Sequence, residues 1–109
     1  MFSSPKEIFE EKIPTKLKGD PSIAKSINAK VAFVLSGDQG GNWVLDCTQT
    51  PGNVVKGEAA DAKATVTMGA EDFVKLANGD LKPEMAFLTG KLKVKGDMSL
   101  AIKLGKVLT

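Results

Sequence analysis

Apolar and polar residues change their spacing several times along the chain, and each change predicts a helix or a strand. Ser4-Pro5-Lys6-Glu7 is typical of a helix start, and the apolar residues that follow keep helical spacing until Pro14, which we expect to bend or end the helix. Asp20-Pro21 repeats the start signal for a short second helix through Ile27. In residues 29–36 both alternating faces are apolar, which favours a central strand covered on both sides.

The middle of the chain alternates with a period of two, which predicts strands. A glycine-rich turn at residues 37–41 leads into a strand at residues 43–47, and we expect this strand to pair with the preceding one as a hairpin. Residues 53–56 and 64–68 continue the series of strands, and residues 69–78 predict a helix.

The last third contains three elements in succession. Pro83 begins a short helix, residues 91–96 alternate lysine with apolar residues as a strand, and Asp97 begins a final helix. Strands therefore come in a run while helices cluster at both ends, which predicts an α+β fold with a mostly antiparallel sheet covered by helices. The last strand is separated from the others by helices, so it could pair in parallel. No repeat or linker interrupts residues 1–109, so we expect a single domain.

The final helix has more apolar circumference than docking on a sheet requires. Its apolar arc spans roughly 200° on a helical wheel, whereas one buried face needs about 100°. We expect one part of the arc to cover the sheet, through Leu100, Leu104 and Val107. The rest needs another partner, and it comprises Met98, Ala101 and Ile102. That partner is either an apolar ligand or another helix of the domain. In the second case the final helix is wedged between the sheet and the other helix, and both of its faces are ordinary core.

The short helix after Pro83 repeats this surplus. Met85, Ala86, Phe87 and Leu88 are consecutive, so their side chains point all round the helix axis. Thioether side chains adapt to several apolar shapes and so suit a ligand pocket, although methionine also fills gaps in an ordinary core.

Three lysines, Lys91, Lys93 and Lys95, share one face of the last strand. They can protect an exposed sheet edge, attract an anionic membrane or the phosphates of an acyl-coenzyme A, or do both. Residues 81–109 carry six lysines and two acidic residues, so the basic character lies at this end although the net charge of the chain is only +2. Nucleic acid is a poor partner because the chain has no arginine and few aromatic residues.

The composition excludes most catalytic chemistry. The chain has no histidine and one cysteine, so no Ser-His-Asp or Cys-His arrangement exists within it, and we expect no metal, no cofactor and no enzymatic activity. Cys47 lies in a strand among apolar neighbours, which favours a small buried residue over a nucleophile. A small enzyme that uses carboxylates or Cys47 is a weak hypothesis, because it needs a titratable group inside a pocket and the sequence offers no clear candidate. The sequence shows neither a signal peptide nor a membrane-spanning run, which favours an intracellular protein.

The sharpest motif is Gly-Asp-Leu-Lys-Pro-Glu-Met-Ala-Phe-Leu-Thr-Gly-Lys-Leu-Lys-Val-Lys-Gly-Asp-Met at residues 79–98, and Leu-Ala-Ile-Lys-Leu at residues 100–104 continues it. Thr65-Val66-Thr67-Met68, followed by Asp72-Phe73, is a second and weaker motif. These motifs resemble the sterol carrier protein 2 family, the intracellular non-specific lipid-transfer domain, and the likeness spans nearly the whole chain.

The resemblance implies a five-stranded sheet with about five helices around an apolar tunnel. It also implies binding and transfer of fatty acids, fatty acyl-coenzyme A, phospholipids or sterols without catalysis, by a protein that we expect to be a monomer. The expected ligand-binding residues are Phe33, Met85, Phe87, Leu88, Met98, Ala101 and Ile102. The three lysines of the last strand are the expected contacts with a head group or with an anionic membrane.

Two positions depart from the family's pattern. The chain stops at Val107-Leu108-Thr109, whereas eukaryotic relatives often end in a peroxisomal tripeptide such as Ala-Lys-Leu, so we expect a cytoplasmic or peroxisomal location. Glu84 stands where relatives often carry glutamine, which leaves a head-group contact there open. The alternative function is a protein-interaction or accessory module of a multidomain lipid-metabolising enzyme. A large exposed apolar patch favours that alternative, and an enclosed cavity favours the carrier.

Overall fold

The computed structural model describes residues 2–49 and 52–108, with the backbone alone at residue 101 and residues 105–108. Five strands form one sheet, in the order β3-β2-β1-β4-β5. The strands are β1 (Lys30–Ser36), β2 (Gly41–Asp46), β3 (Asn53–Lys56), β4 (Ala64–Gly69) and β5 (Leu92–Gly96). The helices are α1 (Pro5–Glu7), the π-helical turn η1 (Ile8–Lys12), α2 (Ile13–Gly19), α3 (Ser22–Ile27), α4 (Ala70–Ala77), α5 (Pro83–Leu88) and α6 (Met98–Leu108).

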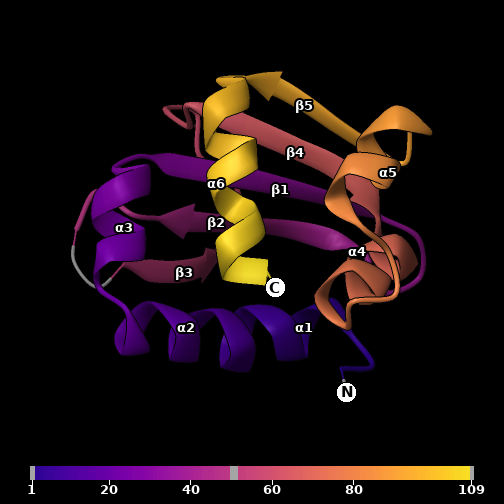
Figure 1. Cartoon of the computed structure of the whole chain (residues 1–109), viewed down its shortest axis with the longest axis horizontal. Helices are drawn as coiled ribbons and strands as arrows, with labels where there is room; N and C mark the ends of the chain where they lie inside the picture. Colours follow the sequence, from indigo (N-terminus) through magenta and orange to yellow (C-terminus); the bar gives the residue numbers. More distant parts are fainter. Residues whose placement is uncertain (1, 50–51, 109) are drawn as a thin grey trace.

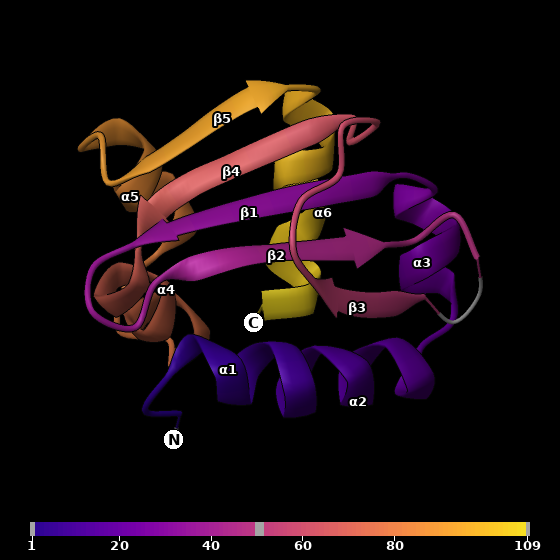
Figure 2. The ribbon, with the colours of Figure 1, turned by 180° about the vertical axis from the view of Figure 1, so that it is seen from behind.

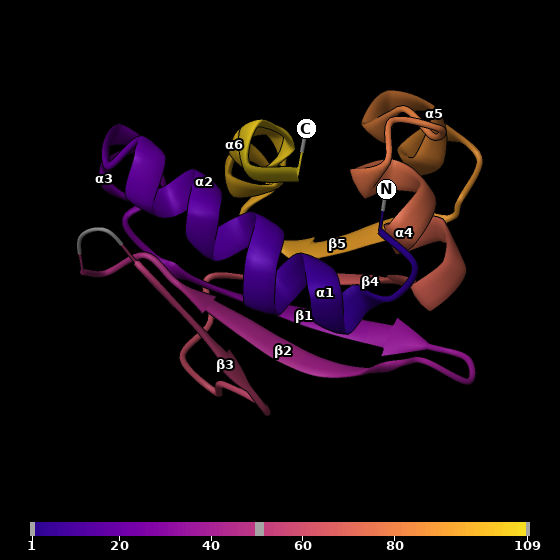
Figure 3. The same ribbon diagram turned by 90° about the horizontal axis from the view of Figure 1, so that it is seen from below.

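The described helices lie together on one face of the sheet (Figures 1 and 3). This layout confirms the predicted α+β fold. Strand β1 is central, as expected, but its two faces are not covered alike. Phe33 is buried on the helix side, whereas Val34 on the opposite face is 38% exposed. The cover on that side is the segment from Gly57 to Lys63, which links β3 to β4 and crosses behind the sheet (Figure 2).

That crossing segment also sets the direction of the strands. β1 and β2 form the predicted antiparallel hairpin, with Phe33 opposite Trp43. Because the chain crosses the sheet between β3 and β4, β4 runs parallel to β1, with Phe33 opposite Val66. The expectation that the last strand could pair in parallel is wrong, since β5 runs antiparallel to β4, with Val66 opposite Val94. Helices α4 and α5 both lie at the end of the sheet where β4 stops, so β5 starts there and runs back (Figure 1).

The N-terminal helix continues through the proline that was expected to bend or end it. Pro14 has no N–H, and its ring would clash with a carbonyl one turn earlier in a regular α-helix. The structure widens that turn instead, because η1 is π-helical and the N–H of Ile13 bonds to the carbonyl of Ile8. Pro14 then occupies the first turn of α2, where a missing donor costs little, and the helix runs on to Gly19.

An aromatic cluster joins the N-terminal helix, the sheet and α4. The ring of Phe9 stacks between Trp43 and Phe73, with centroid separations of 4.8 Å and 5.0 Å. Phe33 meets Phe9 edge-on at 5.1 Å and Phe73 at 5.9 Å. These geometries are the favoured ones for aromatic pairs, and the four rings are buried.

Hydrogen bonds also join the N-terminal segment and helix to the end of α4. Asn78, just after α4, accepts from the N–H of Phe2 and donates to its carbonyl, both at 2.8 Å. Lys12 Nζ donates to the carbonyl of Ala77 at 2.6 Å, where the negative end of the α4 dipole favours a cation. Burial, and secondarily the charge of Lys16, lowers the pKa of Lys12.

Replacing Phe9 by alanine should destabilise the fold by about 3–5 kcal/mol, because it leaves a cavity at the centre of the aromatic stack. Urea unfolding followed by circular dichroism measures the loss. The matched control is Phe87→Ala, which removes an exposed ring and should cost under ~1 kcal/mol. Equal destabilisation by both variants would contradict the central role of Phe9.

Candidate functional site

Helix α5 is a short helix whose apolar residues largely face solvent. Pro83 occupies its first turn, where its fixed backbone angle suits a helix start. Of the four consecutive apolar residues, only Ala86 is buried, while Met85, Phe87 and Leu88 are 51%, 46% and 77% exposed. The prediction that these side chains point all round the axis is therefore confirmed. Because the helix docks through one small residue, its large side chains are left outside the core.

The end of α5 is closed by a fixed turn. Gly90 has a φ of 78°, which glycine adopts without strain. The N–H of Lys91 bonds to the carbonyl of Ala86 at 2.9 Å, and the N–H of Gly90 bonds to the carbonyl of Phe87 at 3.2 Å. This pair of bonds is a Schellman motif. It holds the end of α5 and the start of β5 in one orientation.

Helix α6 divides its apolar residues as the sequence predicts. Leu100 and Leu104 are buried in the core, whereas Met98 and Ile102 are 42% and 77% exposed. The helix does pack beside α2 and α3 as well as the sheet, as the wedged alternative required. That packing nevertheless leaves Met98 and Ile102 open to solvent. The side chains of two predicted residues, Ala101 and Val107, lie outside the described part of the structure.

Polar contacts fix the start of α6 and its side toward α3. Asp97 begins the helix as predicted, accepting from the Ser99 N–H at 2.9 Å and from the Ser99 hydroxyl at 2.6 Å. These hydrogen bonds, led by that of the hydroxyl, lower the pKa of Asp97. Lys103 Nζ donates to the carbonyl of Ser26 at 2.9 Å, which ties α6 to α3. Because one side of α6 is held against α3 in this way, Met98 and Ile102 stay on the outer surface.

Helices α5 and α6 both contact β5 and lie on the same face of the sheet (Figure 3). We call the exposed apolar residues of the two helices together the α5–α6 apolar surface, and they are Met85, Phe87, Leu88, Met98 and Ile102. Phe33 is not brought to this surface, since its ring is buried in the aromatic cluster. The five predicted residues of this surface are therefore open to solvent rather than packed into solid core.

Two of the three predicted lysines, Lys93 and Lys95, lie on the opposite face of the sheet, whereas Lys91 lies just before β5. Strand β5 is an edge strand, and Lys93 and Lys95 are exposed opposite Thr67 and Thr65 of β4. Leu92 and Val94 alternate with them and pack against the core. The predicted alternation of the strand is confirmed. A ligand between helices and sheet would meet these lysines only around the open edge of β5.

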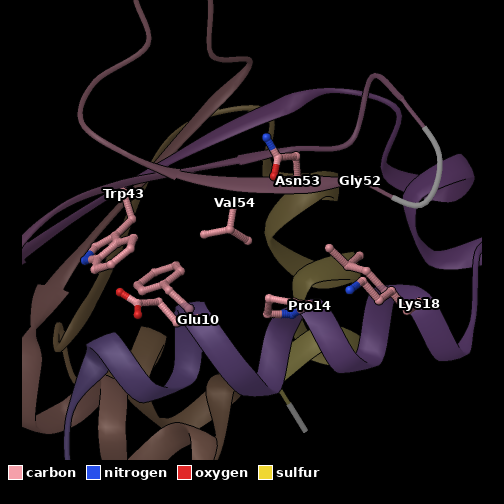
Figure 4. Close-up of a pocket in the computed structure, with 9 residues that line it drawn as sticks. Glu10, Pro14, Lys18, Trp43, Gly52, Asn53 and Val54 are labelled. Atoms are coloured by element: carbon pink, nitrogen blue, oxygen red, sulfur yellow. The ribbon is translucent and has the colours of Figure 1, made fainter.

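A cavity of about 300 Å³ lies elsewhere, between the N-terminal helix and strands β2 and β3 (Figure 4). Its lining residues are Phe9, Glu10, Pro14, Leu17, Lys18, Trp43, Gly52, Asn53 and Val54. Gly52 has a φ of 102°, and a side chain there would approach Leu17 to 3.2 Å. This cavity was not predicted, because its apolar residues carry the pattern of ordinary core and the space between them depends on how closely β3 approaches α2.

The described residues contain little reactive chemistry. No group of three histidine, cysteine or acidic residues within them is placed to hold a metal ion. Cys47 is buried, and its burial, with a smaller effect of Asp46, raises the pKa of the thiol to about 11. A thiol with such a pKa is almost entirely protonated near neutral pH and is a poor nucleophile. This supports the interpretation of Cys47 as a small buried residue.

The sheet order and the single helical layer define a sterol-carrier fold, and solved structures agree. The solution structure of palmitated SCP2L2 from Aedes aegypti covers 97% of this chain and 95% of its own, at 26% identity and a TM-score of 0.78. The solution structure of sterol carrier protein 2 from Aedes aegypti in complex with palmitate covers 94% and 92%, at 26% identity and a TM-score of 0.76.

The family follows from the sequence match. The model of the SCP-2 sterol transfer family matches residues 9–109, and the chain belongs to this family. The human hydroxysteroid dehydrogenase-like protein 2 is 49% identical over 87 residues, which are 79% of this chain and 21% of that protein. The chain thus spans about a fifth of the length of the curated relatives it matches. Across the described residues, no helix has both the length and the apolar character needed to cross a membrane.

Because Cys47 is buried and its thiol is protonated, the folded protein should react with a thiol reagent at pH 8 much more slowly than the urea-unfolded chain does. A time course with dithionitrobenzoate measures both rates. Free cysteine added at the same concentration controls for the reagent. Labelling of the native protein as fast as that of free cysteine would show that Cys47 is an accessible, reactive thiol.

Proposed function

We propose that this domain binds and carries lipids without catalysing a reaction on them. The candidate ligands are fatty acids, fatty acyl-coenzyme A, phospholipids and sterols. The structural observation behind the proposal is that five large apolar side chains of α5 and α6 are exposed on the helical side of the sheet. Exposure alone also suits the interaction module, so the choice of a lipid rests as well on the ligands of the same fold. A surface of this kind is costly in water and commonly marks a binding site. The palmitate in two solved structures of the same fold supports the same class of ligand.

The proposed ligand contacts are the five residues of the α5–α6 apolar surface, with Ala101 on α6. Phe33, whose ring is buried in the aromatic cluster, is proposed only as part of the floor of the tunnel. We expect α5 and α6 to close over a hydrocarbon chain and form the tunnel. Helix α5 is suited to such a movement, since Ala86 is its only fully buried apolar residue. Helix α6 is anchored more firmly, through Leu100, Leu104 and the bond from Lys103 to α3.

The energetics suit a carrier. Ten buried methylene groups contribute about 8 kcal/mol of binding free energy at ~0.8 kcal/mol each. The loss of ligand freedom takes back several kcal/mol, which leaves an affinity on the order of micromolar. A carrier with that affinity both holds its ligand and releases it. Lys91, Lys93 and Lys95 would add attraction for an anionic head group that extends around the edge of β5.

A second function is an accessory or interaction domain within a larger lipid-metabolising protein. It is favoured by the relatives, because the matched region is about a fifth of proteins named hydroxysteroid dehydrogenase-like protein 2. The open character of the α5–α6 apolar surface also suits docking against another domain. The two functions differ in their requirement for a ligand, so a binding titration on the isolated chain separates them. For either function we propose an intracellular monomer, in the cytoplasm or the peroxisome.

Titration of the protein with a fluorescent fatty acid, in the absence of vesicles, should give a saturable signal with micromolar affinity. Phe87→Ala and Ile102→Asp should each weaken binding about tenfold or more, because each removes apolar contact with the hydrocarbon chain. The matched control is Val55→Asp, which places the same charge at a 45% exposed valine on the opposite face of the sheet, and it should bind normally. Absence of saturable binding by the folded wild-type chain would sink the carrier proposal.

A further inference from the structure

The corner where α5 turns into β5 combines exposed apolar and basic side chains. We define the α5–β5 corner as residues 82–93. Leu88, in the last turn of α5, is 77% exposed, and Phe87 beside it is 46% exposed. Lys82, Lys91 and Lys93 are also exposed. Figures 1 and 3 place α5 at the outer margin of the helical layer, away from the N-terminal helix.

The backbone of this corner is unusually well prepared for an apolar environment. A helix end normally leaves four carbonyls without partners, and each costs free energy when it leaves water. Here the carbonyl of Met85 accepts from the N–H of Thr89 at 3.0 Å and from its hydroxyl at 2.7 Å. The carbonyls of Ala86 and Phe87 accept from Lys91 and Gly90 in the Schellman motif. The Thr89 hydroxyl is therefore hydrogen-bonded to a helix carbonyl. Moving this helix end out of water costs less free energy than it would with both groups unpaired.

The charges around the corner have one dominant sign. Residues 82–93 contain three lysines, and Glu84 is the only acidic residue among them. Lys91 follows directly after the Schellman glycine, and the bond from its N–H to the Ala86 carbonyl fixes its backbone at the end of α5. Lysines beside inserted apolar side chains match the arrangement by which peripheral proteins bind anionic bilayers.

A bilayer fits these features better than a protein partner does. A stable protein interface buries about 800 Å² on each side around a large apolar centre. Two protruding side chains at the end of a six-residue helix supply little of that area. Shallow insertion into a bilayer needs only a few apolar side chains, provided that basic residues lie at the level of the head groups.

We propose that the α5–β5 corner docks onto bilayers that contain anionic phospholipids, with Leu88 and Phe87 inserted below the head groups and Lys82 and Lys91 among the phosphates. This deepens the proposed carrier function and rests on it for its biological purpose, since a carrier must exchange lipid with a membrane. The docking itself requires no bound ligand. Docking in this orientation places α5, the helix proposed to move, against the membrane. Lipid would then enter or leave the tunnel at α5.

The test is co-sedimentation of the full chain, free of ligand, with vesicles of phosphatidylcholine alone or mixed with phosphatidylserine. The mixed vesicles should bind the protein, and added salt should weaken the binding. Leu88→Ser should lower the partition coefficient about tenfold or more, through loss of the inserted side chain. Lys91→Gln should lower it about fivefold on the mixed vesicles and leave it unchanged on phosphatidylcholine.

Two matched variants control for these changes. Val55→Ser alters an exposed apolar residue on the opposite face of the sheet, and Lys25→Gln removes an exposed lysine of α3. Both should bind mixed vesicles like the wild type, and circular dichroism checks that each variant is folded. The proposal is overturned if the wild type does not bind the mixed vesicles, or if the controls lose as much binding as Leu88→Ser and Lys91→Gln.

The failure of docking and the failure of the carrier function give different results. A protein that binds fatty acid in solution but no vesicles keeps the carrier function and rejects the docking corner. A protein that binds vesicles through Leu88 and Lys91 but no fatty acid keeps the corner and rejects the carrier. Loss of vesicle binding in Lys82→Gln, an exposed lysine outside the proposed ligand contacts, with unchanged affinity for a fatty acid in solution would support docking as a separate event.

Discussion

The stack of Phe9 between Trp43 and Phe73 is the interaction on which the rest of the fold depends. All described helices lie on one face of the sheet, so a single core must join them (Figure 3). Phe9 supplies that junction, because it contacts a strand on one side and α4 on the other. Large aromatic rings contribute much of the apolar area buried in a small core. The N-terminal helix and the strands of the middle are thereby held as one rigid unit.

The elements after α4 depend on this unit but contribute much less to it. Helix α5 adds only Ala86 to the fully buried core, and α6 adds Leu100 and Leu104 among its described side chains. The large apolar residues of these helices therefore remain available for contacts outside the core. A rigid sheet with lightly attached helices at one margin is a suitable architecture for a binding protein, because the helices can move without unfolding the rest.

Local sequence patterns were sufficient to predict most elements and the orientation of α6. The division between Leu100 and Leu104 on one side and Met98 and Ile102 on the other follows from helical spacing alone, and burial confirms it. The hairpin of β1 and β2, the lysine alternation of β5 and the starts of α5 and α6 were also predicted correctly. Each of these features is determined by residues close in sequence, so its signal is contained in a short window.

Features that depend on distant contacts were predicted less well. The parallel pairing of β1 with β4 requires the chain to cross the sheet after β3. The residue pattern of the two strands does not indicate that crossing. The helix runs on through Pro14 because a π-helical turn precedes it, an outcome that a rule ending helices at proline does not consider. Phe33 was expected near the ligand because of the resemblance, and its packing against the rings of Phe9 and Phe73 is a distant contact that the sequence does not show.

The crossing segment behind the sheet has a consequence for how the protein forms during synthesis. Its position is fixed at one end by the ion pair of Lys30 with Asp61 and by the bond from the Lys63 N–H to the Lys30 carbonyl. Since β1 obtains its second neighbour only when β4 arrives, the emerging chain exposes an unpaired edge of its most apolar strand until residues 64–69 have been synthesised. Such an edge can pair with other chains. The nascent polypeptide therefore depends on rapid completion, or on a chaperone, to avoid association through β1.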